Sequence, residues 1–198
     1  GGQSKMITDG DGIETYPATL SSGDKVAILY ADARQAQSVA IVPANSGQAR
    51  VITSLPDRFP RGAHVIPENV TLTAEDGLEF NNQLFLPSDL QEGEQRPALI
   101  FIHGGSRRQM LLGYHHRGFY HMAYAMNQYF ASRGYVVLSV NYRSGIGYGK
   151  EFRNSPGRGG QGNTEYRDVL AAGKYLQSRD DVDASRVGIW GLSYGGIL

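Results

Sequence analysis

The chain has 198 residues, of which 40% are apolar and 10% aromatic, which is enough for a hydrophobic core and excludes a disordered chain. Its 19 basic and 19 acidic residues cancel, so the net charge predicts neither nucleic-acid nor membrane-surface binding, and we expect a small molecule or a peptide as partner. The absence of cysteine excludes disulfides, thiolate metal sites and a cysteine nucleophile, and no apolar stretch approaches the roughly 18 residues of a membrane span. We expect neither a cofactor nor a bound metal.

The first five residues contain no initiator Met and no signal-peptide pattern. We therefore expect the chain to be an internal piece of a longer polypeptide. A secretion signal, if the protein has one, would precede Gly1, so the compartment is left open.

Residues 1–55 are predicted to form short strands separated by turns. The β-branched and aromatic segments are 15–20, 25–31, 37–43 and 49–54. Four strands of this length predict an antiparallel meander the size of one β-propeller blade, with residues 1–12 as the tail of a preceding blade; the edge of a small β-sandwich is the alternative. The stretch from Asp9 to Gly12 faintly resembles a calcium loop, but a tight turn is the favoured interpretation.

Residues 56–67 contain several prolines and no periodicity, which predicts a linker. A second domain is expected over residues 68–198. It begins with short strands at 70–73, 78–80 and 83–86, which predict an antiparallel hairpin at a sheet edge.

After residue 97 the pattern changes to that of an α/β fold. A continuous apolar run at 98–102 predicts a strand that is buried on both faces, as parallel sheets require. The segment 135–140 predicts the next buried strand, and 186–190 predicts a third parallel strand. Between them, one helix is predicted to end at Gly134, with Met122, Ala125, Met126, Tyr129 and Phe130 on its inner face. A second helix is predicted to start at Asn163 or Thr164, with Glu165 and Asp168 in its first turn and Tyr166, Val169, Leu170 and Gly173 inside. The ligand site of such a sheet lies at the carboxyl ends of its strands.

A Gly-x-Ser-x-Gly pattern follows the last predicted strand. It comprises Gly191, Ser193 and Gly195, and it predicts a nucleophile elbow, in which a serine occupies a strained turn between a strand and a helix. The flanking glycines suit this turn because a Cβ would clash where strand and helix cross. By itself the pattern is weak in a glycine-rich chain, so its context has to support it.

Three motifs, each at the end of a predicted strand, together supply that context. They are Ile102-His103-Gly104-Gly105, the segment 141–149 (NYRSGIGYG) and the segment 183–196 (DASRVGIWGLSYGG). In this order they closely resemble the prolyl oligopeptidase family of serine peptidases, especially its dipeptidyl-peptidase and acylaminoacyl-peptidase branches. The resemblance covers about residues 68–198. It implies an α/β-hydrolase domain preceded by a β-propeller, and hydrolysis of peptide bonds in short peptides.

The expected roles of the site residues follow from this fold. Ser193 is the predicted nucleophile, and the backbone N–H of Tyr194 is one expected donor to the oxyanion. The second donor is expected from Gly104 or Gly105, and the similarity to acylaminoacyl peptidases favours Gly105. His103 precedes the serine in a fold whose order is Ser, Asp, His, so we expect it to hold the turn rather than to act as the base.

No Asp, Glu or His follows Ser193, and all five histidines precede it. The acid and base that the resemblance implies are therefore expected beyond Leu198, and the chain as given is expected to be nearly inactive because a serine without its base is a poor nucleophile.

Several other residues are interpreted without a catalytic role. His115, His116 and His121 are expected to be solvated loop side chains rather than metal ligands, and Gly145, Gly147 and Gly149 lack the spacing of a dinucleotide loop. Arg143, Arg153 and Arg158 are expected at the surface, with contact to substrate or to the other domain as the alternative. Beside a truncated serine peptidase, two hypotheses stay open: an esterase with the same fold, and a non-catalytic binding protein. Oligomerisation is possible under each of them.

Overall fold

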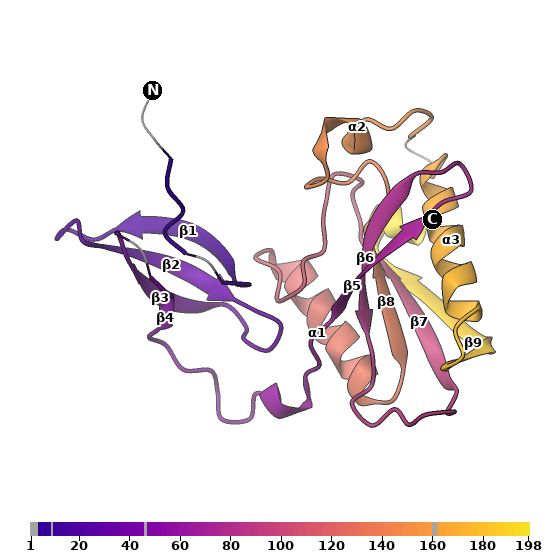
Figure 1. The fold of residues 1–198 in the computed structure, drawn as a ribbon, viewed down its shortest axis with the longest axis horizontal. Helices are drawn as coiled ribbons and strands as arrows, with labels where there is room; N and C mark the ends of the chain where they lie inside the picture. Colours follow the sequence, from indigo (N-terminus) through magenta and orange to yellow (C-terminus); the bar gives the residue numbers. More distant parts are fainter. Residues whose placement is uncertain (1–3, 9, 46, 160–161) are drawn as a thin grey trace.

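The computed structural model describes residues 4–8, 10–45, 47–159 and 162–198. In this part of the chain the strands form two separate β-sheets, and helices flank the second of them (Figure 1). None of the helices described here has both the length and the apolar character that crossing a bilayer requires.

The first sheet is an antiparallel meander. Its strands, in sequential order, are β1 (Ile13–Thr19), β2 (Lys25–Ala31), β3 (Ser38–Pro43) and β4 (Arg50–Val51). Ile28, Ala40 and Val42 form its small buried cluster. The predicted meander is confirmed, although β4 is shorter than expected because it pairs with β3 at only two positions. Asp9 of the calcium-loop candidate lies outside the described residues.

The second sheet contains the strands β5 (Glu68–Thr73), β6 (Glu79–Phe85), β7 (Arg96–Ile102), β8 (Val136–Val140) and β9 (Val182–Gly191). Their order is β5-β6-β8-β7-β9, with β8, β7 and β9 parallel and the β5–β6 hairpin antiparallel at one edge. All three predicted parallel strands and the edge hairpin are confirmed.

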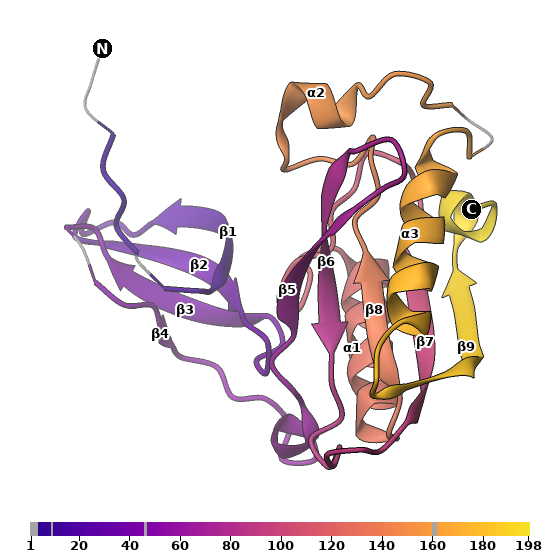
Figure 2. The same ribbon diagram turned by 45° about the vertical axis from the view of Figure 1, so that its right-hand side comes forward.

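Two helices cover opposite faces of this sheet (Figure 2). α1 (Gly118–Ser132) packs with Phe85, Phe101 and Val137, whereas α3 (Glu165–Gln177) packs with Ile100 and Leu138. Alternate residues of the buried strands therefore supply two cores, as expected for a sheet that is covered on both sides. Three short elements complete the chain: the 3-10 helices η1 (Arg61–Ala63) and η2 (Ser193–Gly196), and the helix α2 (Gly149–Arg153).

The predicted inner face of α1 is wrong for three of its five residues, while Ala125 and Phe130 are partly buried and pack against the core. Met122, Met126 and Tyr129 are 61%, 39% and 56% exposed, and the buried face instead carries Ala123, Tyr124, Asn127, Gln128 and Ala131. A polar contact explains why this face of α1 is buried. The Gln128 amide accepts a hydrogen bond from the Val65 N–H at 2.9 Å and donates to the Val65 carbonyl at 2.8 Å. Burying this amide satisfies a connecting segment whose backbone groups would otherwise lack partners, an effect that apolar periodicity does not report.

The predicted inner face of α3 is partly wrong. Val169 is buried, but Tyr166 is 51% exposed, and Glu165 and Asp168 are buried instead. Thr164 occupies the predicted N-cap position, but its hydroxyl donates to the Pro156 carbonyl rather than to the helix. The first turn of α3 thus buries two carboxylates, which contact Ser144 and Arg143.

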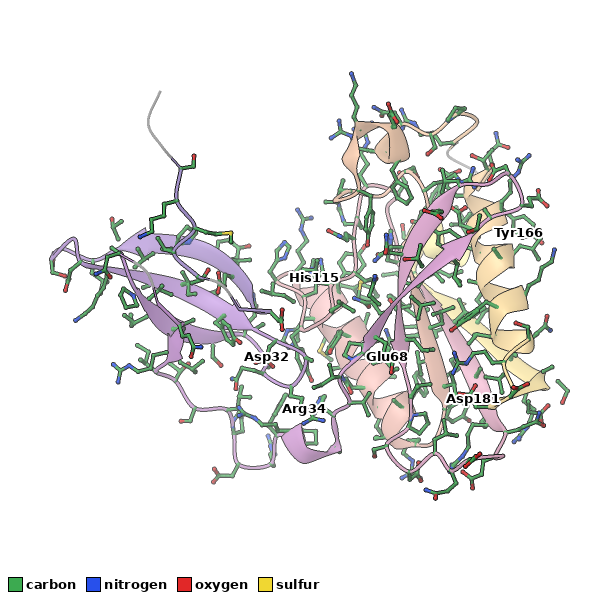
Figure 3. The ribbon with its side chains drawn as sticks, in the orientation of Figure 1. Asp32, Arg34, Glu68, His115, Tyr166 and Asp181 are labelled. Carbon is green, nitrogen blue, oxygen red and sulfur yellow. The ribbon has the colours of Figure 1, made fainter. Side chains whose placement is uncertain are left out.

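The loop between β2 and β3 contacts the segment that leads into α1. The Asp32 carbonyl accepts a hydrogen bond from the Tyr114 N–H at 3.1 Å, and the Ala33 carbonyl accepts one from the Tyr124 hydroxyl at 3.0 Å. Figure 3 shows Asp32 and Arg34 in this region between the four-stranded sheet and α1, with Tyr166 on the far side of the molecule on α3. The first sheet therefore packs on the side of the second sheet that α1 covers.

Candidate active site

Ser193 is the first residue of η2 and lies in a strained turn that follows the end of β9 at Gly191. Its φ is 57°, in the left-handed region that residues with a side chain seldom adopt, and its side chain is exposed. The two flanking glycines are sterically required. A Cβ at Gly191 would lie 2.8 Å from the Ile102 carbonyl oxygen, and one at Gly195 would lie 2.6 Å from the His103 carbonyl oxygen. This backbone has the geometry of a nucleophile elbow.

The turn that follows β7 lies directly against this elbow. A Cβ at Gly104 would lie 2.6 Å from the Leu192 carbonyl oxygen and 3.2 Å from the Ser193 Cβ. Because β7 and β9 are neighbouring parallel strands, their carboxyl ends bring the two turns together. The serine and the candidate oxyanion turn are thus adjacent, although 89 positions separate Gly104 from Ser193 in the chain.

Two tyrosine hydroxyls orient the peptide groups of this turn. Tyr142 donates to the His103 carbonyl at 3.0 Å, and Tyr120 donates to the Gly104 carbonyl at 2.9 Å. No peptide bond in the described residues is cis, so the N–H of Gly105 points away from the carbonyl that Tyr120 holds. Gly105 itself has a φ of 50°, which glycine adopts at little cost. The sequence does not single out either tyrosine, because Tyr120 lies in the first turn of α1 and Tyr142 in a loop, and nothing in the local pattern links them to the Gly104 turn.

The residue after the nucleophile is held by its side chain. The Tyr194 hydroxyl donates to the Gly159 carbonyl, and its ring centroid lies 6.0 Å from that of Tyr142. Burial is the main cause that raises the pKa of Tyr194, so the hydroxyl stays protonated and remains a donor. These contacts fix the orientation of the residue whose N–H is the expected oxyanion donor.

His103 is fully buried beneath the turn. Its ring stacks on Tyr142 with centroids 4.3 Å apart, and its Nδ1 lies 3.2 Å from the Gly104 carbonyl oxygen. Burial lowers the pKa of His103 to about 4, so the imidazole is neutral near pH 7. This position agrees with a role in holding the turn, because the side chain makes no hydrogen bond to Ser193.

Arg143 is a buried ion-pair centre rather than a surface residue, which corrects the sequence-based expectation. Its guanidinium contacts the Asp76 carboxylate at 2.6 Å and the Asp168 carboxylate at 2.7 Å. The guanidinium lowers the pKa of Asp76, whereas burial raises the pKa of Asp168.

Ser144, the residue after Arg143, has a φ of 69°, and its hydroxyl donates a hydrogen bond to the buried Glu165 carboxylate at 2.9 Å. The Glu165 carboxylate also accepts a hydrogen bond from the Gly159 N–H at 3.4 Å. A polar network thus joins the loop after β8 to the segment that holds Tyr194.

Of the three histidines predicted to be solvated loop side chains, His115 is buried, His116 is partly exposed, and His121 is partly exposed but lies within α1. His115 is only 3% exposed; its Nε2 lies 3.1 Å from the Gln109 carbonyl, and its Nδ1 accepts the Arg117 N–H at 2.9 Å. It lies beside α1 in Figure 3. Both nitrogens are therefore used by backbone groups. Within the described ranges, no group of three or more His, Cys, Asp or Glu side chains has the arrangement of a metal site.

The structure therefore gathers Ser193, Tyr194, Gly104 and Gly105 at one end of the sheet, and it places His103 beneath them. Arg153 and Arg158 lie exposed near this end, as predicted. No histidine or carboxylate in the described residues hydrogen-bonds to Ser193, so the four residues are a candidate nucleophile and a candidate oxyanion turn without a neighbouring acid or base.

Comparison with known proteins gives consistent matches. The family model described as the prolyl oligopeptidase family matches residues 120–198. An uncharacterized peptidase, YuxL, of Bacillus subtilis (strain 168) is 34% identical over 149 residues, which are 74% of this chain and 21% of that protein. Human dipeptidyl peptidase 8 is 34% identical over 145 residues, which are 73% of this chain and 15% of that protein.

A solved structure agrees in fold. The puromycin-hydrolyzing peptidase of Mycobacterium tuberculosis superposes with a TM-score of 0.74 at 26% identity, covering 88% of this chain and 26% of that one. The present chain thus spans only about a fifth of the length of the first of these curated relatives. Its five-stranded sheet is part of an α/β-hydrolase fold, and its four-stranded meander has the size of one propeller blade. On the sequence motifs, the fold and these matches, the chain belongs to the prolyl oligopeptidase family of peptidases.

Proposed function

We propose that this chain carries the nucleophile and the oxyanion hole of a serine peptidase that cleaves short peptides through an acyl-enzyme on Ser193. The observation that carries the proposal is the left-handed conformation of Ser193, with φ of 57°, opposite the Gly104 turn. A serine that is held in a strained backbone conformation between a strand and a helix, with its hydroxyl exposed, is positioned to attack a carbonyl.

The oxyanion is bound by two backbone donors in this proposal. The Tyr194 N–H is the first, and the Gly105 N–H is the second, because the Gly104 carbonyl is turned toward Tyr120. Gly104 serves by letting bare backbone approach the serine. Loss of one such donor typically costs about 3 kcal/mol of transition-state stabilisation. His103 stays neutral and positions the turn.

The acid and the base of the triad are proposed to follow Leu198 in a longer polypeptide. Support comes from the order of the triad in this fold and from the greater length of the relatives. The 198-residue chain alone is then expected to be nearly inactive, since triad members act as a unit. Peptides are the proposed substrates because the relatives are named as peptidases, and an amide of the puromycin type is a useful first probe because one structural neighbour is named for hydrolysing puromycin.

A fluorophosphonate probe tests the proposal. The full-length protein should be labelled, and Ser193→Ala should abolish the labelling while circular dichroism stays unchanged. The 198-residue chain should label far more slowly than the full-length protein. Labelling that persists in Ser193→Ala, or a folded full-length protein that takes no label, would contradict the proposal and favour the binding-protein hypothesis. Parallel turnover of matched ester and amide substrates distinguishes a peptidase from an esterase.

A further inference from the structure

The central part of the chain has an unusual charge distribution. From residue 95 to residue 150 the sequence contains no Asp and no Glu, but it contains basic residues at Arg96, Arg107, Arg108, Arg117, Arg133, Arg143 and Lys150. This region includes the oxyanion turn and the loops on either side of it. The overall charge of zero therefore hides an excess of positive charge over residues 95–150, the segment that contains the turn next to Ser193.

Among the described residues, carboxylates from elsewhere in the chain form ion pairs with two of these basic residues. Arg96 pairs with Glu94 at 2.6 Å, and Arg143 pairs with Asp76 and Asp168. Among the described residues, no carboxylate lies within 4.0 Å of the Arg107, Arg108 or Arg117 side chains, all of which precede α1. The uncompensated charge is thus concentrated in the loop that continues the oxyanion turn.

Arg108 is the member of this group that lies next to the turn. A Cβ at Gly105 would lie 4.0 Å from the Arg108 guanidinium carbon and 4.0 Å from its Nη2. Gly104, the preceding residue, is the one that packs against Ser193. The guanidinium therefore lies beside the proposed oxyanion donor, and its charge adds to the burial that lowers the pKa values of His103 and His115.

Arg108 is also held in place. Its carbonyl accepts the Ile146 N–H at 3.1 Å, its Nη1 donates to the Arg107 carbonyl at 2.9 Å, and its side chain is half-buried. These contacts use one end of the guanidinium, while Nη2 makes no hydrogen bond within the described residues. A guanidinium presents a planar fork of donors that matches a carboxylate, and a preorganised fork loses little entropy on binding.

From this arrangement we propose that Arg108 is a substrate-recognition residue that binds a carboxylate of the peptide next to the scissile bond. The inference rests on the proposed function of Ser193. The carboxylate has two chemical sources: the C-terminus of a short peptide, or an Asp or Glu side chain. Both give the same contact to the guanidinium, so the experiment distinguishes them.

The test uses the full-length protein and any short peptide that it cleaves, with products separated by chromatography. One arm compares the free acid of the peptide with its C-terminal amide. The other arm compares Glu with Gln at each position of the amidated peptide. Wild-type protein should prefer the carboxylate in one arm, and Arg108→Gln should lower kcat/KM for that peptide by about 10- to 100-fold while changing that of its uncharged partner by about twofold or less.

Arg133→Gln is the matched control, because it removes an exposed positive charge far from the Gly104 turn. Arg133 lies at the C-terminal end of α1, and the next residue, Gly134, lies beside Arg96. The control should leave the preference intact, and Arg108→Lys should retain part of it. No carboxylate preference in the wild type, or the same preference in Arg108→Gln as in the wild type, would overturn the inference. Fluorophosphonate labelling of each protein separates this failure from failure of the proposed function, which would abolish labelling of the wild type itself.

Discussion

The Tyr120 hydroxyl donates a hydrogen bond to the Gly104 carbonyl at 2.9 Å, and this bond joins the first turn of α1 to the turn beside Ser193. It orients the peptide group that carries the Gly105 N–H. The position of the proposed oxyanion donor thus depends on a side chain that touches neither the nucleophile nor, in the proposed mechanism, the substrate.

We predict that Tyr120→Phe lowers kcat of the full-length enzyme by about 10-fold with little change in KM. The expected loss is smaller than the 10²–10³ that removal of an oxyanion donor costs, because the donor is misaligned rather than deleted. Steady-state kinetics measure it. Tyr129→Phe is the control, since Tyr129 lies on the same helix but is 56% exposed, and its substitution should leave kcat unchanged. Equal kinetics for the two variants would contradict a positioning role for Tyr120.

Gly104→Ala is predicted to disrupt the site through sterics alone. The added Cβ would lie 2.6 Å from the Leu192 carbonyl oxygen, a backbone atom that can move only if the elbow moves. We expect a loss of activity of about 100-fold, as for a displacement of about 1 Å in a catalytic constellation. Gly118→Ala provides the comparison, because a Cβ there has no neighbour within 4 Å, and it should leave fluorophosphonate labelling at the wild-type rate. Wild-type labelling of Gly104→Ala would show that the two turns are not in close contact.

The buried Arg143 network makes a prediction about stability. Arg143→Met leaves the Asp168 carboxylate, which is fully buried, without its cation, and we expect a loss of about 3–5 kcal/mol in the free energy of unfolding. Urea denaturation measures this loss. Arg186→Met breaks an exposed pair with Asp183 and should cost at most about 1 kcal/mol. If both variants lost the same small amount, Arg143 would not be a structural centre of the fold.

The buried state of His103 predicts a dependence of stability on pH. Its folded pKa of about 4 lies below the unfolded value near 6.5, so between these values the unfolded chain binds more protons. The contribution is therefore fully present above about pH 6.5 and is lost as the pH falls toward 4. From pH 7 to pH 5 this histidine alone should reduce the free energy of unfolding by about 2 kcal/mol. Denaturant titrations at the two pH values check it, and His103→Asn should show a shallower dependence. An unchanged slope in that variant would assign the pH effect to other groups.

Much of the fold and of the candidate site can be predicted from the sequence. The continuous apolar run at 98–102 predicts a buried parallel strand, which the structure contains as β7, and the segment 186–190 is predicted as a further parallel strand and lies in β9. β9 is less buried than β7, and Ile189 is 56% exposed. Parallel strands place their carboxyl ends together, so the Gly104 turn and Ser193 can be expected at one edge before any coordinates are known. The strained φ of Ser193 likewise follows from the glycines on either side of it.

The inner faces of α1 and α3 show where sequence reasoning ends. Apolar periodicity places Met122, Met126 and Tyr166 inside, but all three are exposed. Some of the buried positions are occupied instead by polar and charged side chains, and Gln128 and Asp168 are two examples. Each of these finds its partner 25 or more positions away, at Val65 and at Arg143. Such a pairing cannot be inferred from the local pattern, because an isolated polar residue at that position would be read as solvent-exposed.

The sequence by itself therefore indicated the parallel strands, the edge hairpin, the elbow and Ser193 as the candidate nucleophile, because these depend on local backbone preference and on apolar patterning. Only the tertiary structure decided how the Gly104 turn is oriented, that Arg143 is a buried ion-pair centre, and that Arg108 lies beside Gly105 without a carboxylate partner among the described residues. These features depend on which hydrogen-bonding and charged groups meet across long sequence separations. Burial increases the energetic effect of each such contact, because a buried polar or charged group without a partner is costly.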